Sequence, residues 1–95
     1  MAELRLEIDR LDHSLVELLS QRQRYIERAA EIKAHRHEIR DEARVADVLG
    51  KVAQAAKSSG LDPDIAEAVW RELIERSIAL EMRRYEGLSA SNTRE

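Results

Sequence analysis

Residues 2–36 read AELRLEIDRLDHSLVELLSQRQRYIERAAEIKAHR, and this stretch decides the fold. Its apolar side chains recur at alternating spacings of three and four residues, which is the period of a helix with one buried stripe. No glycine or proline interrupts the stretch. We therefore predict one helix over residues 2–36, with a stripe made of Leu4, Ile8, Leu11, Leu15, Leu18, Tyr25, Ala29 and Ile32.

This helix is too long for a domain of this size. At 1.5 Å of rise per residue it would measure roughly 50 Å, whereas a compact chain of 95 residues has a radius of gyration of about 12 Å. The rest of the chain cannot cover such a stripe, and leaving it in water would favour aggregation. We therefore expect a second copy to cover it, in an obligate, intertwined homodimer with paired long helices.

Two shorter helices follow. Asp41 can cap the second, which runs to about residue 58 and is ended by Gly60. Asp62 and Pro63 supply the cap and first residue of the third, which runs to about residue 86. Residues 35–40 have no apolar period and indicate a loop. We expect the inward residues to be Val45, Val48, Leu49, Val52 and Ala55 in the second helix and Ala66, Val69, Trp70, Leu73, Ile74 and Ile78 in the third.

The composition favours one all-α domain, over residues 1–87, with a disordered polar tail at 88–95. A net charge of −3 does not indicate a nucleic-acid partner, and the absence of cysteine excludes a disulfide scaffold. No apolar run approaches the length of a membrane span or a leader. The sequence holds no set of metal ligands at zinc spacing and no glycine-rich phosphate loop. We expect a cytoplasmic protein without membrane, metal or cofactor.

Two cations interrupt the stripe of the first helix. Arg22 continues the series of Ile8 and Leu15, although its guanidinium cannot lose its charge. An unpaired cation buried there would cost several kcal/mol. Lys33 lies eleven residues further on, only about 20° away around the helix. Together they predict a pocket for an anion.

The third helix shows the same anomaly. Ser77 and Glu81 interrupt its stripe and are neighbours on one face. Taken alone, both residues would have a structural role: Ser77 would bond to its own helix, and Glu81 would lie at the edge of the stripe and pair with Arg84 or Arg22. Together with Arg22 and Lys33 they favour a ligand site, because polar groups converge in an apolar interior.

Two further arginines would be ordinary surface residues on their own and gain a role only in combination with other residues. Arg44 borders the Val45 face of the second helix and would otherwise be a solvated surface residue. Arg5 lies about 25 Å from Arg22 along the first helix, too far for one small ligand to touch both. An antiparallel partner would bring Arg5 of one chain near Arg22 of the other.

Over residues 3–87 the sequence resembles the all-helical chorismate mutases. Members of that family are intertwined homodimers that rearrange chorismate to prephenate, in phenylalanine and tyrosine biosynthesis, and each active site borrows an arginine from the opposite chain. The resemblance rests on Leu4-Arg5, Ile8-Asp9, Leu11-Asp12, Leu18-Leu19, Arg22, Ile32-Lys33, Arg40-Asp41, Arg44, Ser77 and Glu81.

The resemblance implies a role for each polar residue. Arg5, donated in trans, and Arg22 would clamp the substrate carboxylates, and Lys33 would donate to the ether oxygen and a carboxylate. Arg44 would line the carboxylate side, and Ser77 would support a carboxylate. The reaction needs positioning of the enolpyruvyl group and donors to the ether oxygen, which gains negative charge as its bond stretches.

The two remaining positions are acidic. Asp41 would contact the ring hydroxyl, and Glu81 would occupy the second donor position at the ether oxygen, where well-known bacterial members have glutamine. An ionised carboxylate can only accept hydrogen bonds. Glu81 must therefore be protonated to donate, and kcat/KM should fall as the pH rises and deprotonates it.

A second departure concerns substrate choice. Many relatives have a glutamate directly after the second-helix arginine, for the ring hydroxyl, whereas this chain has Val45. Isochorismate-pyruvate lyases lack that glutamate too, and the run Arg44-Val45-Ala46 resembles theirs, but they usually lack the aspartate that is present here as Asp41. We favour the mutase over the lyase or an aminodeoxychorismate mutase. A non-catalytic helical dimer or regulatory partner is the alternative of another class; it predicts cations paired with carboxylates and no cavity.

Overall fold

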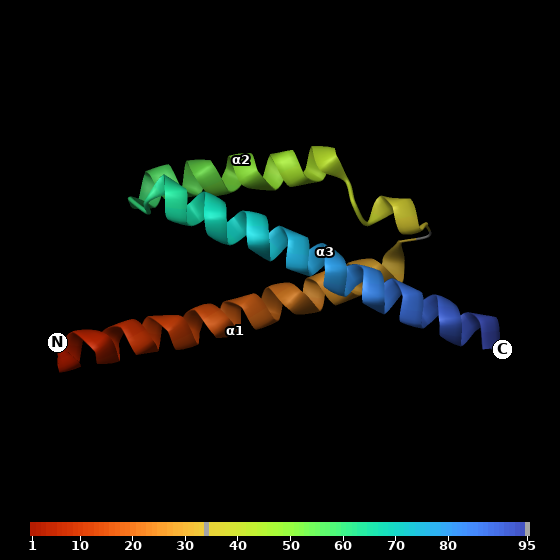
Figure 1. Ribbon diagram of the computed structural model, residues 1–95, viewed down its shortest axis with the longest axis horizontal. Coiled ribbons are helices and arrows are strands. Elements are labelled where there is room, and N and C mark those ends of the chain that lie inside the picture. The colour runs from red at the N-terminus through yellow and green to blue at the C-terminus, as the bar shows by residue number, and fades with distance from the viewer. Residues whose placement is uncertain (34, 95) are drawn as a thin grey trace.

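The chain folds into helices only, as predicted. The computed structural model describes residues 1–33 and 35–94, with side chains up to residue 88, and contains no strand within them. The elements are α1 (Ala2–Ile32), the 3₁₀ turn η1 (Arg36–Glu38), α2 (Glu42–Ser59) and α3 (Pro63–Arg94). In Figure 1, α2 folds back along the first half of α3, and α3 crosses α1 at the carboxyl-terminal part of α1.

The single chain is elongated and has a small core. Its radius of gyration is 16.6 Å and its extents are 57 × 29 × 15 Å, against about 12 Å for a compact chain of this length. The amino-terminal half of α1 projects away from the other helices (Figure 1). The stripe residues Leu4, Ile8, Leu11, Leu15 and Leu18 are 48–65% exposed there. The buried apolar residues are Ala30, Ile39, Ala56, Ala66 and Ile74.

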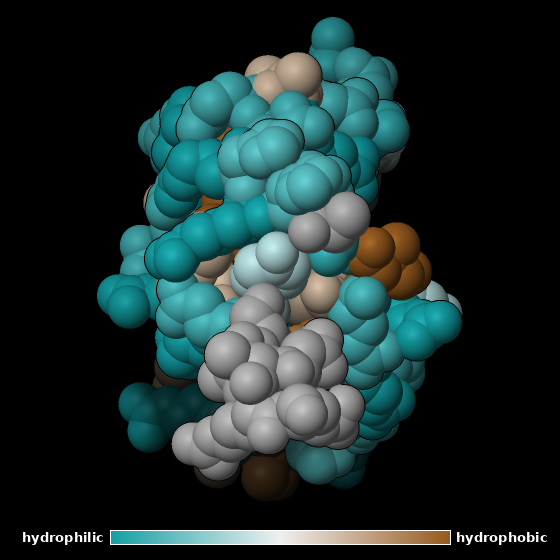
Figure 2. Space-filling model, turned by 90° about the vertical axis from the view of Figure 1, so that its right-hand side faces the viewer, coloured by the Kyte–Doolittle hydropathy of each residue, from teal (hydrophilic) through white to brown (hydrophobic). Residues whose placement is uncertain are grey.

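The opposite end of the molecule, where η1 lies and α3 runs out, presents a different surface. Figure 2 looks at this end, and the coloured surface there is mostly hydrophilic, with few apolar groups. Exposed apolar surface on α1 is not confined to its amino-terminal half, because Tyr25 and Ile32, which were predicted to lie in the buried stripe, are 78% and 69% exposed. Within the described residues, no helix is both long and apolar enough to cross a membrane.

The predicted caps of α2 and α3 are confirmed, but α3 is not a shorter helix as predicted, since its 32 residues match the 31 of α1. The side chain of Asp41 accepts a hydrogen bond from the backbone N–H of Arg44 at 3.2 Å and begins α2. Gly60 ends α2 in the left-handed conformation, at φ 80°, which glycine adopts without strain. Asp62 accepts from the backbone N–H of Asp64 at 2.8 Å ahead of α3, whose first residue is Pro63.

The predicted end of the first helix is wrong. α1 stops at Ile32 instead of residue 36, and Lys33 is extended, with ψ 129°. The following segment is not a plain loop, because it contains η1 and inserts Ile39, which is only 4% exposed, into the core. Burying Ile39 and pairing Lys33 with α3 both require the chain to turn here. Nothing in the local sequence marks that turn, and residue 34 lies outside the described residues.

Three other expectations differ from the structure. α3 continues to Arg94, beyond residue 86, because Gly87 alone does not stop a helix and no proline follows it. In α2 the buried alanine is Ala56 and not Ala55. Val69 of α3, which was predicted to face inward, is 49% exposed in the single chain. The division of the chain at residue 87 into a domain and a disordered tail stays a prediction.

Candidate functional site

A cavity of about 490 Å³ lies between α1, η1, α2 and α3. α1 and α3 contribute the faces on which polar residues interrupt an apolar stripe, and α2 contributes the Val45 face that Arg44 borders. The apolar part of its wall comes from residues such as Ile26, Val48 and Ile78. The predicted site residues that line it are Arg22, Lys33, Asp41, Arg44, Ser77 and Glu81.

Lys33 and Glu81 form an ion pair at the inner end of this site. The Lys33 Nζ atom lies 2.5 Å from Glu81 Oε1 and donates a hydrogen bond to it. The side chain of Glu81 is 6% exposed and that of Lys33 is 26% exposed. A buried carboxylate needs such a partner, because the charge would otherwise lose its hydration without compensation. The sequence analysis paired Glu81 with Arg84 or Arg22; instead, Arg84 lies 3.6 Å from Glu27.

Arg22 points from α1 to α3, where its Nη1 donates a hydrogen bond of 2.7 Å to the Ser77 hydroxyl. Burial lowers the pKa of Arg22, and the positive charge of Arg44 lowers it further. Among the described residues no carboxylate forms an ion pair with Arg22. The guanidinium therefore remains a cation with hydrogen-bonding capacity toward the cavity, as an anion site requires.

Arg44 and Asp41 belong to the first turn of α2. Arg44 Nη1 donates to Asp47 Oδ2 at 2.8 Å. Lys51 also donates to this carboxylate, and these hydrogen bonds, chiefly that from Lys51, hold the pKa of Asp47 below its ordinary value. Arg44 would exchange its exposed partner for a ligand in the cavity. Asp41 uses its Oδ1 atom for the helix cap, so its second oxygen is the acceptor available to a ligand.

Arg5 is not part of this cavity. It is exposed in the first turns of α1, on the projecting half of that helix. The cavity walls of one chain therefore assemble every predicted site residue except the one that was expected to come from a partner. Its role in trans stays a prediction.

The sequence analysis missed four residues in the cavity wall: Tyr25, Ile26, Glu38 and Ile39. It assigned Tyr25 only to the apolar stripe, gave Ile26 no place, and put Glu38 and Ile39 in a loop without function. Glu38 precedes Ile39, an isolated apolar residue in a polar segment. That isolated residue was the one signal that this segment folds back onto the domain.

The charges around the cavity balance. Three cations line it (Arg22, Lys33 and Arg44), together with three carboxylates (Glu38, Asp41 and Glu81). A dianionic ligand would need an excess of positive charge, so the wall of one chain is not by itself complementary to it. Either another cation must be added, or a carboxylate must be protonated.

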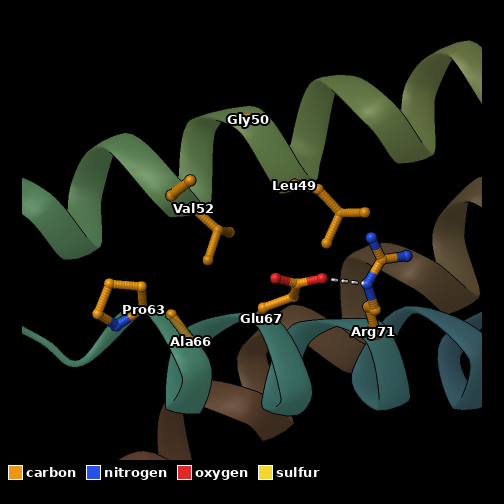
Figure 3. Close-up of a pocket in the computed structure, with 8 residues that line it drawn as sticks. Leu49, Gly50, Val52, Pro63, Ala66, Glu67 and Arg71 are labelled. Atoms are coloured by element: carbon orange, nitrogen blue, oxygen red, sulfur yellow. Dashed lines mark hydrogen bonds and ion pairs between the residues drawn. The ribbon is translucent and has the colours of Figure 1, made fainter.

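A second hollow, of about 300 Å³, lies at the other end of α2 and α3. In Figure 3, Val52 points from α2 toward Pro63 and Ala66 at the start of α3, and Leu49 points toward Glu67 and Arg71 further along α3. The charged residues there satisfy one another, since Arg71 Nε donates to Glu67 Oε1 at 2.9 Å. The two charged groups that line it are therefore paired with each other, and the rest of its lining is apolar or small.

The fold and the larger cavity together define a class of protein: an all-helical domain whose helices enclose a cavity lined by charged residues of both signs. The chain belongs to the chorismate mutase type II family, whose sequence profile matches residues 4–82. A curated relative, the isochorismate pyruvate lyase of Pseudomonas aeruginosa, is 34% identical over 79 residues, which cover 83% of this chain and 78% of the relative.

Proposed function

We propose that this protein is a chorismate mutase, which converts chorismate to prephenate. The observation that carries the proposal is the single cavity that brings Arg22, Lys33 and Arg44 together with Asp41. Three cations suit the two carboxylates and the ether oxygen of chorismate, and Asp41 offers an acceptor to its ring hydroxyl. The cavity argues against a non-catalytic dimer, which requires none, although the pairing of Lys33 with Glu81 fits that alternative.

In the proposed reaction the ether C–O bond breaks while a C–C bond forms within the same molecule. Arg22, held by Ser77, would orient a carboxylate so that the enolpyruvyl group lies over the ring. Lys33 would leave Glu81 and donate to the ether oxygen as negative charge grows there. A protonated Glu81 would supply the second donor. Proton uptake by Glu81 would also leave the cavity with net positive charge.

We further propose that the site is completed by Arg5 of a second chain, in a homodimer. Two observations support this arrangement. The charges lining the cavity balance, so a dianion needs one more cation than a single chain supplies. The leucine stripe beside Arg5 is exposed along the projecting half of α1. A second copy that covers this stripe would bring its own Arg5 along with it.

Sedimentation equilibrium tests the dimer. At micromolar concentration the protein should have about twice the chain mass of 10.9 kDa, because exposing a contiguous stripe of this size is unfavourable. Leu11→Glu, in the middle of the stripe, should shift the mass toward that of one chain. Glu7→Gln, on the same helix, serves as the control. A folded, monodisperse wild-type monomer would contradict both the dimer and the shared site.

Isochorismate-pyruvate lyase is the second candidate, because the lyase relative is similar over most of the chain and Val45 lines the cavity. Incubation with chorismate, isochorismate and aminodeoxychorismate in turn, followed by product identification, distinguishes the activities. We expect prephenate from chorismate with weak substrate binding, and at most slight release of pyruvate from isochorismate. Lyase activity that exceeds mutase activity would reverse this ranking.

A further inference from the structure

Val45 is apolar, so its part of the cavity wall offers no side-chain hydrogen-bond acceptor, whereas Glu38 belongs to the same wall and carries a carboxylate. Where related mutases carry a glutamate for the ring hydroxyl, Val45 is apolar. Glu38, from η1, lines the same cavity as Val45 and Asp41. Its side chain forms no hydrogen bond or ion pair with the rest of the described chain. Glu38 is exposed and is therefore an acceptor without a partner in the described chain, in the wall of the proposed substrate site.

The segment that carries Glu38 is held on both sides. Arg36 Nη2 lies 2.6 Å from Glu86 Oε1 of α3. On the other side, Ile39 is buried and Arg40 donates two hydrogen bonds to Glu75 of α3, at 3.2 and 2.5 Å. The Glu38 backbone N–H donates to the His35 carbonyl at 3.1 Å and closes the turn. These contacts fix the backbone from which Glu38 reaches the cavity, so its position does not depend on a free loop.

We propose that Glu38 accepts the hydrogen bond of the substrate's ring hydroxyl and thereby determines specificity at that position. This inference rests on the proposed mutase function. Asp41 is a weaker candidate, because its Oδ1 atom caps α2 and only its second oxygen is available, whereas both oxygens of Glu38 are without a partner in the described chain. Glu38 thus takes over, from a different element, the task that the residue at position 45 performs in relatives.

Removing Glu38 would have opposite effects on substrate binding depending on whether its carboxylate acts only through its charge or also accepts a hydrogen bond. Its carboxylate lines a cavity for a dianion, so deleting the charge should strengthen substrate binding if Glu38 makes no contact. If Glu38 accepts from the hydroxyl, deleting it removes a hydrogen bond with a charged acceptor and should lower kcat/KM. The direction of the change therefore separates the two cases.

The test compares chorismate with an analogue in which hydrogen replaces the ring hydroxyl, in wild type, Glu38→Leu and the control Glu42→Leu. Glu42 neighbours Asp41 but does not line the cavity. We expect Glu38→Leu to lower kcat/KM for chorismate about tenfold and to leave or raise it for the analogue, with little change in the control. Calorimetric titration of both compounds gives the same comparison for binding. The double variant Glu38→Leu/Val45→Glu should recover most of the loss, because it restores a carboxylate at the relatives' position.

Equal losses for chorismate and the analogue, or a gain with chorismate, would overturn the role of Glu38 and leave the mutase proposal intact. Absence of chorismate turnover and binding in the wild type would instead overturn the proposed function, and the role of Glu38 with it. Failure of Val45→Glu to rescue Glu38→Leu, while the loss remains specific to the hydroxyl, would show that position 45 does not reach the hydroxyl and would overturn the proposed exchange of roles.

Discussion

Replacing Lys33 with methionine is expected to lower kcat for chorismate by about 10²–10³-fold, the usual cost of losing one donor to a developing oxyanion. The same change leaves the buried Glu81 carboxylate without its partner at 2.5 Å. An uncompensated buried charge would cost about 3 kcal/mol of folding free energy. Steady-state kinetics and urea unfolding of the same preparation measure the two effects together.

Adding Glu81→Gln to Lys33→Met separates the effect of Lys33 on catalysis from its effect on stability. In the double variant Lys33→Met/Glu81→Gln no charge is left unpaired, so stability should recover while activity stays low. The single variant Glu81→Gln should remain active, because glutamine donates a hydrogen bond at any pH. If Glu81→Gln is inactive at every pH, a protonated Glu81 is not the second donor; if the double variant regains activity, Lys33 is not the first.

Mixing two inactive variants should restore activity if Arg5 acts in trans. Arg5→Ala and Arg22→Ala should each lose most activity, since each removes one clamp on a substrate carboxylate. After the two chains are unfolded and refolded together, about half of the dimers are mixed, and each mixed dimer holds one intact site and one with both lesions. The mixture should therefore regain about one quarter of the wild-type activity.

Mixing Arg22→Ala with Lys33→Met is the matched control. Both residues line the cavity of the same chain, so a mixed dimer has one lesion in each site and should stay as inactive as its parents. Recovery in this control would mean that the helices pair differently from the proposed dimer. Failure of the Arg5 and Arg22 mixture to recover, with mixed dimers present by mass spectrometry, would remove Arg5 from the site.

The sequence alone determined the features that depend on near neighbours in the chain. Periodicity predicted the three helices, and Asp41, Gly60 and Asp62 marked their boundaries, because a cap bonds to backbone groups only a few residues away. Arg22 and Glu81 stood out because their charge conflicts with their stripe. The family resemblance ordered these residues into one site, and the cavity brings six of the seven together.

Only the tertiary structure decided which groups meet. Lys33 and Glu81 are 48 residues apart, and Arg22 and Ser77 are 55 apart, so their pairing depends on how α1 crosses α3. The end of α1 at Ile32 and the return of Ile39 to the core are set by packing, which overrides the local helical preference of that stretch. The same turn carries Glu38 to the cavity, a position that no spacing in the sequence predicts. Local preferences form helices, whereas the contacts between helices arise from burial over the whole chain, and those contacts fix the site.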